Sequence, residues 1–519
     1  MVNRRTWLIA ICFAFGVTSI LPAQTVSLLA DRSQKREGDW FVRNDGQTGI
    51  RVYSREMTLH PKAEPKPALK HRFVPDRFDQ VEGNSAVYYL KAMSFLEETR
   101  AREEITKFER NAQADADANG MSGDETPPSV WYGTAPNELP IPEVKKYLAW
   151  HTFQPPLLRE ATRRKSFTLE RRIKDVKNPI MYLLPEIQSM RGLARVQVLR
   201  LRVALAEDRI DDAIRIQGQQ YALAQQLGTD EFLVSNLVGA AVAGMANNDA
   251  LHLLEHPDTP NLYWAFATLP TPLIDMQDSM AYERQVLFEQ VKSLREVTSE
   301  PRSEGYWADF LDRFQPEMEL LASLEMNFNG ETNPAMARAR FVAIVAAAYP
   351  GALQYLTNEA GIDAEKAKAY PQLQTVALAM KLYYEEVRDD VFKWQYTDFH
   401  AASQVRQTLS QEWAEDKKKY GWITEPIQLV LPAIEAVQAA QQRLQQGLAM
   451  RQTFESIREY AATNDNKLPA TLDQLNLPAP NDPFTGKPFQ YELSGKKAVL
   501  TGSKTPSAMQ YRFVMQVAK

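Results

Sequence analysis

The stretch from Arg191 to Glu255 constrains the fold most, because it reads as successive helices that cannot bury their apolar faces alone. Apolar residues recur at spacings of three and four along two segments, which is the period of a helix with one buried face. The polar turn Glu207-Asp208-Arg209 separates these segments and predicts an αα-hairpin. A third segment, from Phe232 to Leu254, carries small residues on every face, so we expect it to be the most buried helix of this region.

The N-terminus has the pattern of a secretory signal. Arg4 and Arg5 precede an apolar run from Trp7 to Leu21, and Ala23 supplies the small residue of a cleavage site. We expect cleavage after Ala23 and export to the periplasm or the cell exterior. The general secretory route is favoured over the twin-arginine route, and an uncleaved N-terminal anchor stays open as an alternative.

Composition excludes several functional classes. Cys12 is the only cysteine, so a chain cleaved after Ala23 has no disulfide, thiolate nucleophile or cysteine metal site. Hydrophobic residues make up 44% of the chain, which is enough for a sizeable core without disulfides. The net charge is −5, and no sustained basic stripe with interleaved aromatic residues is present, so no nucleic-acid partner is expected.

The periodicity predicts a mainly α chain: an irregular array of αα-hairpins followed by a small C-terminal α+β module. We divide it into a signal peptide (1–23), an extended and β-like segment with a Pro-rich linker (24–82), a helical domain (83–432) and the module (433–519). A break near 257–272 divides the helical domain into two subdomains. The Ala- and Val-rich run from Ala335 to Tyr349 is predicted as a buried core helix that ends at Pro350.

The string His252-Leu253-Leu254-Glu255-His256 matches the H-x-x-E-H zinc signature. On a helix the two histidines share a face and can bind one metal ion, with Glu255 as general base. A third ligand would come from a later helix, such as Glu283 or Glu289. Pro257 ends the helix directly after the string, where histidine is also favoured by the helix dipole and by free carbonyls. We therefore prefer a structural role and assign no metal ligand or catalytic residue.

The segment Asp115-x-Asp117-x-Asn119-Gly120 matches the first half of a calcium loop. Such a loop needs a carboxylate at its twelfth position, which here is Thr126, while Glu125 stands one place early. An acidic loop without a metal ion is the preferred interpretation. No cofactor is therefore expected, and metal binding by this loop stays an open alternative.

Two resemblances extend this interpretation. The segments from Gly83 to Glu97 and from Pro260 to Pro270 resemble a family of large exported proteins of planctomycete-type bacteria, which implies an exported, mostly helical protein and no activity. The C-terminal part, with a long helix, the turn around Asp482-Pro483 and then strand-like runs, resembles the periplasmic head of the major pseudopilins of type II secretion. Pseudopilins polymerise through an apolar helix that leads directly into the head, whereas here the apolar segment lies at the other end of the chain.

The sequence thus favours an exported protein of the cell envelope. We expect it to be a structural or protein-binding component without enzymatic activity, and other envelope proteins are its expected partners. No integral membrane span is expected after signal cleavage. Two alternatives stay open: a zinc-dependent hydrolase using His252, Glu255 and His256, and a component of a type II secretion or pilus-like assembly.

Overall fold

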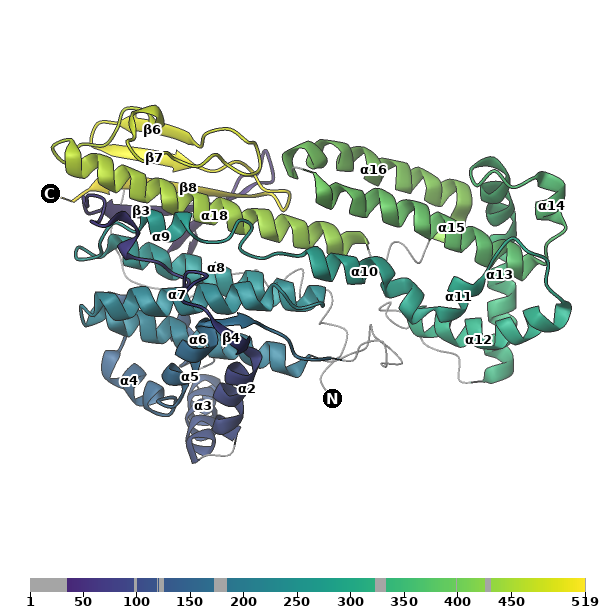
Figure 1. Ribbon diagram of the computed structural model, residues 1–519, viewed down its shortest axis with the longest axis horizontal. Coiled ribbons are helices and arrows are strands. Elements are labelled where there is room, and N and C mark those ends of the chain that lie inside the picture. Colours follow the sequence, from purple (N-terminus) through teal and green to yellow (C-terminus); the bar gives the residue numbers. More distant parts are fainter. Residues whose placement is uncertain are drawn as a thin grey trace. The chain divides into compact units, whose positions relative to one another are not determined.

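The computed structural model describes residues 35–518, apart from residues 98–99, 119, 121–125, 172–183, 323–332, 398 and 425–430. This part of the chain is predominantly helical with a small sheet, so the predicted fold class is confirmed (Figure 1). The chain forms two compact units. Unit 1 is built mainly of residues 277–438, and unit 2 mainly of residues 35–170, 184–276 and 439–519. The change of unit at residues 276 and 277 lies just after the break predicted near 257–272.

Unit 2 contains the three predicted central helices, α6 (Pro185–Ala206), α7 (Ile210–Leu227) and α8 (Leu233–Glu255). The turn between α6 and α7 places Asp208 in the left-handed region with φ 56°. The Arg209 side chain then donates to Glu207 and Asp212, which ties the turn to the first turn of α7. As its small residues predicted, α8 is deeply buried, and Ala243 and Ala250 are fully enclosed.

Residues of the predicted Pro-rich linker pack directly on these helices. A Cβ added to Gly218 of α7 would lie only 2.0 Å from the main-chain oxygen of Phe73. The Phe73 ring centroid is 5.2 Å from that of Tyr221 on α7 and 4.9 Å from that of Phe266 on the short helix α9 (Tyr263–Ala267). The glycine therefore permits a main-chain approach that a side chain would block.

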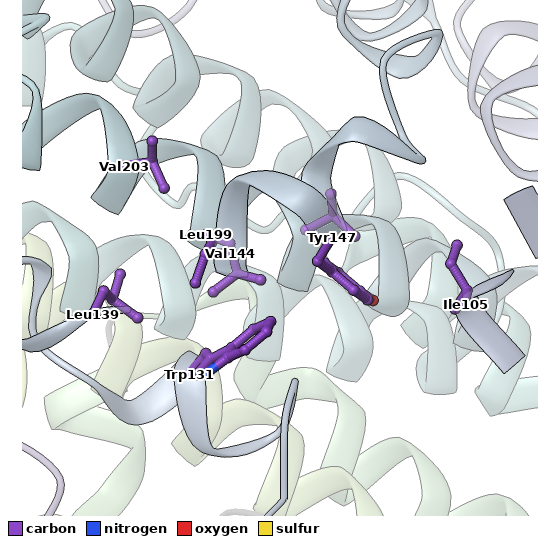
Figure 2. Packing of buried hydrophobic residues seen from close by; sticks show 8 residues of the cluster. Ile105, Trp131, Leu139, Val144, Tyr147, Leu199 and Val203 are labelled. Carbon is purple, nitrogen blue, oxygen red and sulfur yellow. The ribbon is translucent and has the colours of Figure 1, made fainter. Parts of the chain in front are cut away.

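Four further helices belong to the layer beside α6 and α7. They are α2 (Ala86–Glu97), α3 (Arg100–Ala118), α4 (Ile141–Ala149) and α5 (Gln154–Thr162), with the 3-10 turns η3 (Val130–Gly133) and η4 (Pro136–Glu138) between α3 and α4. Two short parallel strands, β4 (Val81–Asn84) and β5 (Arg164–Ser166), flank them. Figure 2 shows the apolar cluster that joins these elements to α6: Ile105, Trp131, Leu139, Val144, Tyr147, Val196, Leu199 and Val203.

The strands at the two ends of the chain form one six-stranded sheet. Its order is β1 (Lys35–Glu37), β2 (Trp40–Asn44), β3 (Arg51–Leu59), β8 (Met509–Val517), β7 (Lys497–Thr501) and β6 (Gln490–Ser494). The β-like N-terminal segment contains the hairpin of β2 and β3, and the strand-like C-terminal runs form a meander of β6, β7 and β8. The predicted division separated them into segments 24–82 and 433–519, whereas β3 and β8 pair in parallel along nine residues. One sheet therefore contains strands from both predicted segments.

The long helix α18 (Leu431–Thr463) precedes the meander and runs along the sheet (Figure 1). The Phe454 ring of α18 lies 4.9 Å from the Phe513 ring of β8, measured between centroids. Glu455 and Arg458 of α18 form an ion pair at 2.8 Å that is completely buried. Arg458 also donates to the main-chain oxygens of His60 and Thr259, so one side chain connects α18, the end of the N-terminal strands and the segment after α8.

Unit 1 is helical throughout its described residues. Its elements are α10 (Gln277–Gln290), α11 (Lys292–Glu296), α12 (Glu304–Ala322), α13 (Pro334–Asn358), α14 (Ala364–Lys368), α15 (Gln372–Phe392), η7 (Lys393–Tyr396), α16 (Phe399–Tyr420) and η8 (Gly421–Thr424). Side chains of α15 hold the loop before α12. Lys381 Nζ donates to the carbonyl oxygens of residues 295 and 297, and Gln374 Nε2 to those of residues 298 and 300.

Three tyrosines join α13, α15 and α16. The rings of Tyr355, Tyr383 and Tyr420 contact one another with centroid separations of 5.5, 5.4 and 6.2 Å. Their hydroxyls donate to three carboxylates near the surface: Glu386, Asp416 and Glu359. These tyrosines lie at the edge of the core of this unit. A buried tyrosine hydroxyl needs a hydrogen-bond partner, and the carboxylates provide it.

The prediction for the Ala- and Val-rich run was wrong in two respects. The helix α13 continues through Pro350 to Asn358 instead of ending there, and it is only partly buried. Phe341 and Val345 face the core, whereas Met336 is 58% exposed and Val342 is 49% exposed. Among the described residues, α13 is also the one helix long and apolar enough to cross a membrane by length and composition, a weak criterion that core helices also meet.

Candidate functional site at the end of α8

The predicted H-x-x-E-H string lies on the last two turns of α8 and just beyond it. Leu251, Leu253 and Leu254 point into the core of unit 2, which leaves His252 and Glu255 on the side that faces the sheet. His256 is the residue that follows the helix and no longer has helical dihedral angles. The three side chains of the string therefore have different surroundings.

Arg55 of β3 connects the string to the sheet. Its Nη2 lies 2.7 Å from Glu255 Oε2 and 3.3 Å from His252 Nδ1, and its Nη1 lies 3.4 Å from Asp39 Oδ2 in the turn between β1 and β2. Glu255 also accepts the main-chain N–H of Thr58 at 3.3 Å. The result is a cluster of alternating charges, which we call the Arg55 cluster, formed by Asp39, Arg55, His252 and Glu255.

The geometry assigns the tautomer of His252. Because a guanidinium only donates, Nδ1 must accept from Arg55, and the ring hydrogen must lie on Nε2. Nε2 is 2.9 Å from Asp39 Oδ2. Although burial raises it, the contact with His252 and its charge, together with the charge of Arg55, hold the pKa of Asp39 well below its usual range. His252 Nδ1 is therefore used by Arg55, whereas Nε2 lies in ion-pair contact with Asp39 without the geometry of a hydrogen bond.

A second, deeper ion pair supports this cluster. Asp249, one turn before His252, accepts from Arg202 Nε of α6 at 3.0 Å and from Gln220 Nε2 of α7 at 3.1 Å. Arg202 Nη1 also donates to the main-chain oxygen of Thr134 at 2.5 Å. Burial raises the pKa of Asp249, and the charge of Arg202 and the hydrogen bond from Gln220 oppose this. All three central helices thus contribute to a hydrogen-bonded polar network.

His256 faces a different set of groups, the exposed Asp208 and Asp258. One ligand atom from each of these three residues could surround a metal ion, because the atoms lie within 4.8 Å of one another. However, His256 Nδ1 accepts the main-chain N–H of Asp258 at 3.2 Å, so Nε2 must carry the hydrogen that it donates to Asp208 at 3.1 Å. A metal ion at Nε2 would need the opposite tautomer, so the hydrogen bonds do not fit a metal ion there.

The structure does not bring the two histidines of the zinc signature to a common point. His252 binds Asp39 and Arg55, whereas His256 binds Asp208. Within the described residues, the group that could hold a metal ion contains His256 but neither His252 nor Glu255. Glu283 and Glu289, the possible third ligands, belong to α10 in unit 1.

Only part of the segment that resembles a calcium loop lies within the described residues. Asp115 and Asp117 lie in the last turn of α3, and Asp117 accepts a hydrogen bond from Gln113 one turn earlier. Asn119 and Glu125 lie outside the described residues. The first two positions of the motif are thus helical, whereas a calcium loop would need them after the helix.

No sequence motif predicted that Asp39 and Arg55 contact this string. Both belong to N-terminal strands about 200 residues from α8, as the separation of 197 residues between Arg55 and His252 shows. A charged residue within the apolar alternation of β3 was the one available indication, because a charge on the buried face of a strand requires a partner.

Comparisons with models of protein families, with curated proteins and with solved structures give no match for this chain.

Proposed function

We propose that this chain is an exported cell-envelope component that acts by binding other proteins through a helical surface rather than by catalysis. The apolar exposed side of α13 is the observation that carries the proposal. Met336 and Val342 are more than two-fifths exposed, and the exposed positions around them are Ala339, Ala343, Ala346 and Ala347, together with Arg338 and Arg340. An exposed apolar patch marks an interaction surface.

The secretory pattern at the N-terminus supports the envelope location. The zinc-hydrolase alternative is less well supported, because His252 faces Asp39 and Arg55 whereas His256 faces Asp208, so the two histidines do not point at one metal position. The secretion-assembly alternative rests on the helix and meander of the C-terminal part, whose sheet is extended by β3.

The proposal is tested by photo-crosslinking in the native envelope. A photoreactive amino acid is placed at Met336 or Val342, and as a matched control at Gln354, an exposed polar position on the same helix. We expect discrete cross-linked protein species from the first two positions and none from the third. Val342→Lys should abolish the species seen from Met336, because a charge at the centre of the apolar surface opposes its burial. Identical patterns from all three positions, or no species, would contradict the proposal.

A further inference from the structure

The turn that precedes β4 in unit 2 carries a phenylalanine ring that unit 2 leaves in water. Phe78 is 94% exposed, which is more than any other large apolar side chain among the described residues. Phe73, only five residues earlier, is buried against Tyr221 and Phe266. Phenylalanine is among the residues most often buried, so the different placement of these two rings needs a cause.

Hydrogen bonds hold Phe78 in its turn. Asp76 Oδ1 accepts the main-chain N–H of Phe78 at 3.1 Å, and the main-chain oxygen of Asp76 accepts that of Asp79 at 2.9 Å. Arg72 binds the other carboxylate oxygen of Asp76. The N–H of Phe78 and the bond from Arg72 hold the pKa of Asp76 below its usual value. Residues 76–79 thus form a β-turn in which Phe78 is the third residue.

Both ends of this turn are attached to unit 2. On one side the main chain of Phe73 lies against Gly218 of α7. On the other side the Val81 N–H donates to the main-chain oxygen of Arg163 at 2.7 Å, where β4 begins to pair with β5. The turn therefore projects from a fixed base, and its ring cannot join the core without loss of these contacts.

The surroundings of the turn are basic. Arg77, beside the ring, is exposed and forms no ion pair with any residue that the structure describes. Basic residues outnumber acidic ones along the turn, the paired strands β4 and β5 and the end of α5: Arg72, Arg77, Arg159, Arg163, Arg164 and Lys165 against Asp76, Asp79, Glu82 and Glu160. Because the whole chain has a net charge of −5, this local excess favours an anionic surface at this place.

A lipid surface fits this arrangement better than a protein pocket does. The chain neighbours of Phe78, Arg77 and Asp79, are both charged and exposed. A protein interface has an apolar core of several residues that become buried together. A bilayer accepts a single aromatic ring at the boundary between head groups and acyl chains, and nearby basic side chains are attracted to anionic head groups.

We propose that the turn of residues 76–79 binds the surface of an anionic lipid bilayer, with the Phe78 ring inserted between lipids and Arg77 at their phosphates. This contact would hold unit 2 at a membrane surface without a membrane span. It rests on residues of unit 2 alone and is independent of the protein contacts proposed for α13.

The test places a polarity-sensitive fluorophore beside Phe78. Asp79→Cys is labelled in a Cys12→Ser chain, which has no other thiol. Gln47→Cys, at an exposed position between β2 and β3, carries the control label. We expect vesicles with phosphatidylglycerol to shift the emission at position 79 to shorter wavelength and leave position 47 unchanged. Vesicles of phosphatidylcholine alone should give a smaller shift. A retained apolar N-terminal segment would not distinguish the two positions.

Two variants in the Asp79→Cys chain assign the shift to side chains of the turn. Phe78→Ala should need roughly tenfold more lipid for half of the shift, because the ring supplies the inserted apolar area. Arg77→Gln should need roughly fivefold more, because it loses one charge near the anionic surface. Lys496→Gln, exposed between β6 and β7, is the matched control and should need the same lipid concentration as the parent chain. All three side chains are exposed, so melting temperatures should not change.

Equal shifts at positions 79 and 47, no shift with phosphatidylglycerol vesicles, or a shift that Phe78→Ala leaves unchanged would overturn the proposal. A photoreactive amino acid at Phe78 that cross-links to an envelope protein, while vesicles give no shift, would assign the ring to a protein pocket instead.

Discussion

Burial gives the histidines of this chain chemical states that their sequence positions do not reveal. His151 lies two residues after the end of α4 and is buried, and its Nδ1 donates to the main-chain oxygen of Tyr147 at 3.1 Å. Burial lowers its pKa to about 4. His252 is also buried but lies between Asp39 and Arg55, which select one tautomer of its ring. Burial therefore favours the neutral form of His151, whereas neighbouring charged groups orient the His252 ring.

The shift of His151 predicts a pH dependence of stability. In the unfolded chain a histidine titrates near pH 6.5, so between about pH 6.5 and 4 the unfolded state binds more protons than the folded state. The contribution of His151 to the free energy of unfolding is therefore complete above about pH 6.5. As the pH falls toward 4, this contribution decreases by roughly 2–3 kcal/mol in total. His151→Gln should remove this part of the slope.

The measurement is urea unfolding of the wild type and His151→Gln at several pH values from 7 to 4. The difference in unfolding free energy between the two proteins should become smaller, or change sign, as the pH decreases. Parallel curves over this range would contradict a neutral buried imidazole at this position.

At the scale of single elements, two glycines in adjacent helices have opposite roles. Gly218 of α7 faces the Phe73 main chain so closely that a methyl group has no room, and a main-chain oxygen cannot rotate away as a flexible side chain can. Gly192 of α6 is exposed, and an added Cβ would meet no atom within 4 Å. The first glycine is required by packing, whereas the second only weakens its helix.

The pair gives a matched prediction. Gly218→Ala should lower the free energy of unfolding by about 2 kcal/mol or more, because the linker must move away from α7. Gly192→Ala should raise it by about 0.5–1 kcal/mol, because alanine is the better helix former in the middle of a helix. Chemical denaturation measures both changes. Similar effects of the two substitutions would show that the close approach of Phe73 is not part of the folded state.

At the scale of the whole of unit 2, the buried pair of Glu455 and Arg458 connects parts of the chain that are far apart in sequence. Burial raises the pKa of Glu455, and the charge of Arg458 opposes this. Arg458 also binds the oxygens of His60 and Thr259, and Asn261 donates to the main-chain oxygens of Lys62 and Glu455. Loss of the arginine would leave buried main-chain acceptors without a donor and would leave the Glu455 carboxylate without its counter-ion.

Arg458→Met should therefore lower the free energy of unfolding by roughly 3–5 kcal/mol. The double variant Glu455→Gln with Arg458→Met should recover part of this loss, because the unpaired buried charge is gone. The exposed pair of Lys467 and Asp465 is the control, and Lys467→Met should change stability by less than about 0.5 kcal/mol. A double variant no more stable than Arg458→Met would argue that the lost hydrogen bonds, rather than the unpaired charge, dominate.

Strong local patterns in the sequence correctly predicted several elements. The period of three to four predicted α6, α7 and α8, the polar turn at Asp208 separated the first two, and the alternating runs after α18 predicted the meander, because each signal depends on neighbours in the chain. The prediction of a fully buried helix was wrong for α13. An apolar composition suggested burial there, but composition does not say which side of a helix another element covers.

Contacts between distant elements could not be predicted from local patterns. The pairing of β3 with β8, the approach of Phe73 to Gly218 and the contacts of Arg55 with His252 and Glu255 join residues about 140 to more than 450 positions apart. No local pattern specifies such contacts, because they depend on how all helices and strands bury their apolar faces at once. For the same reason the H-x-x-E-H string could be recognised in the sequence, but the partners of its histidines could not.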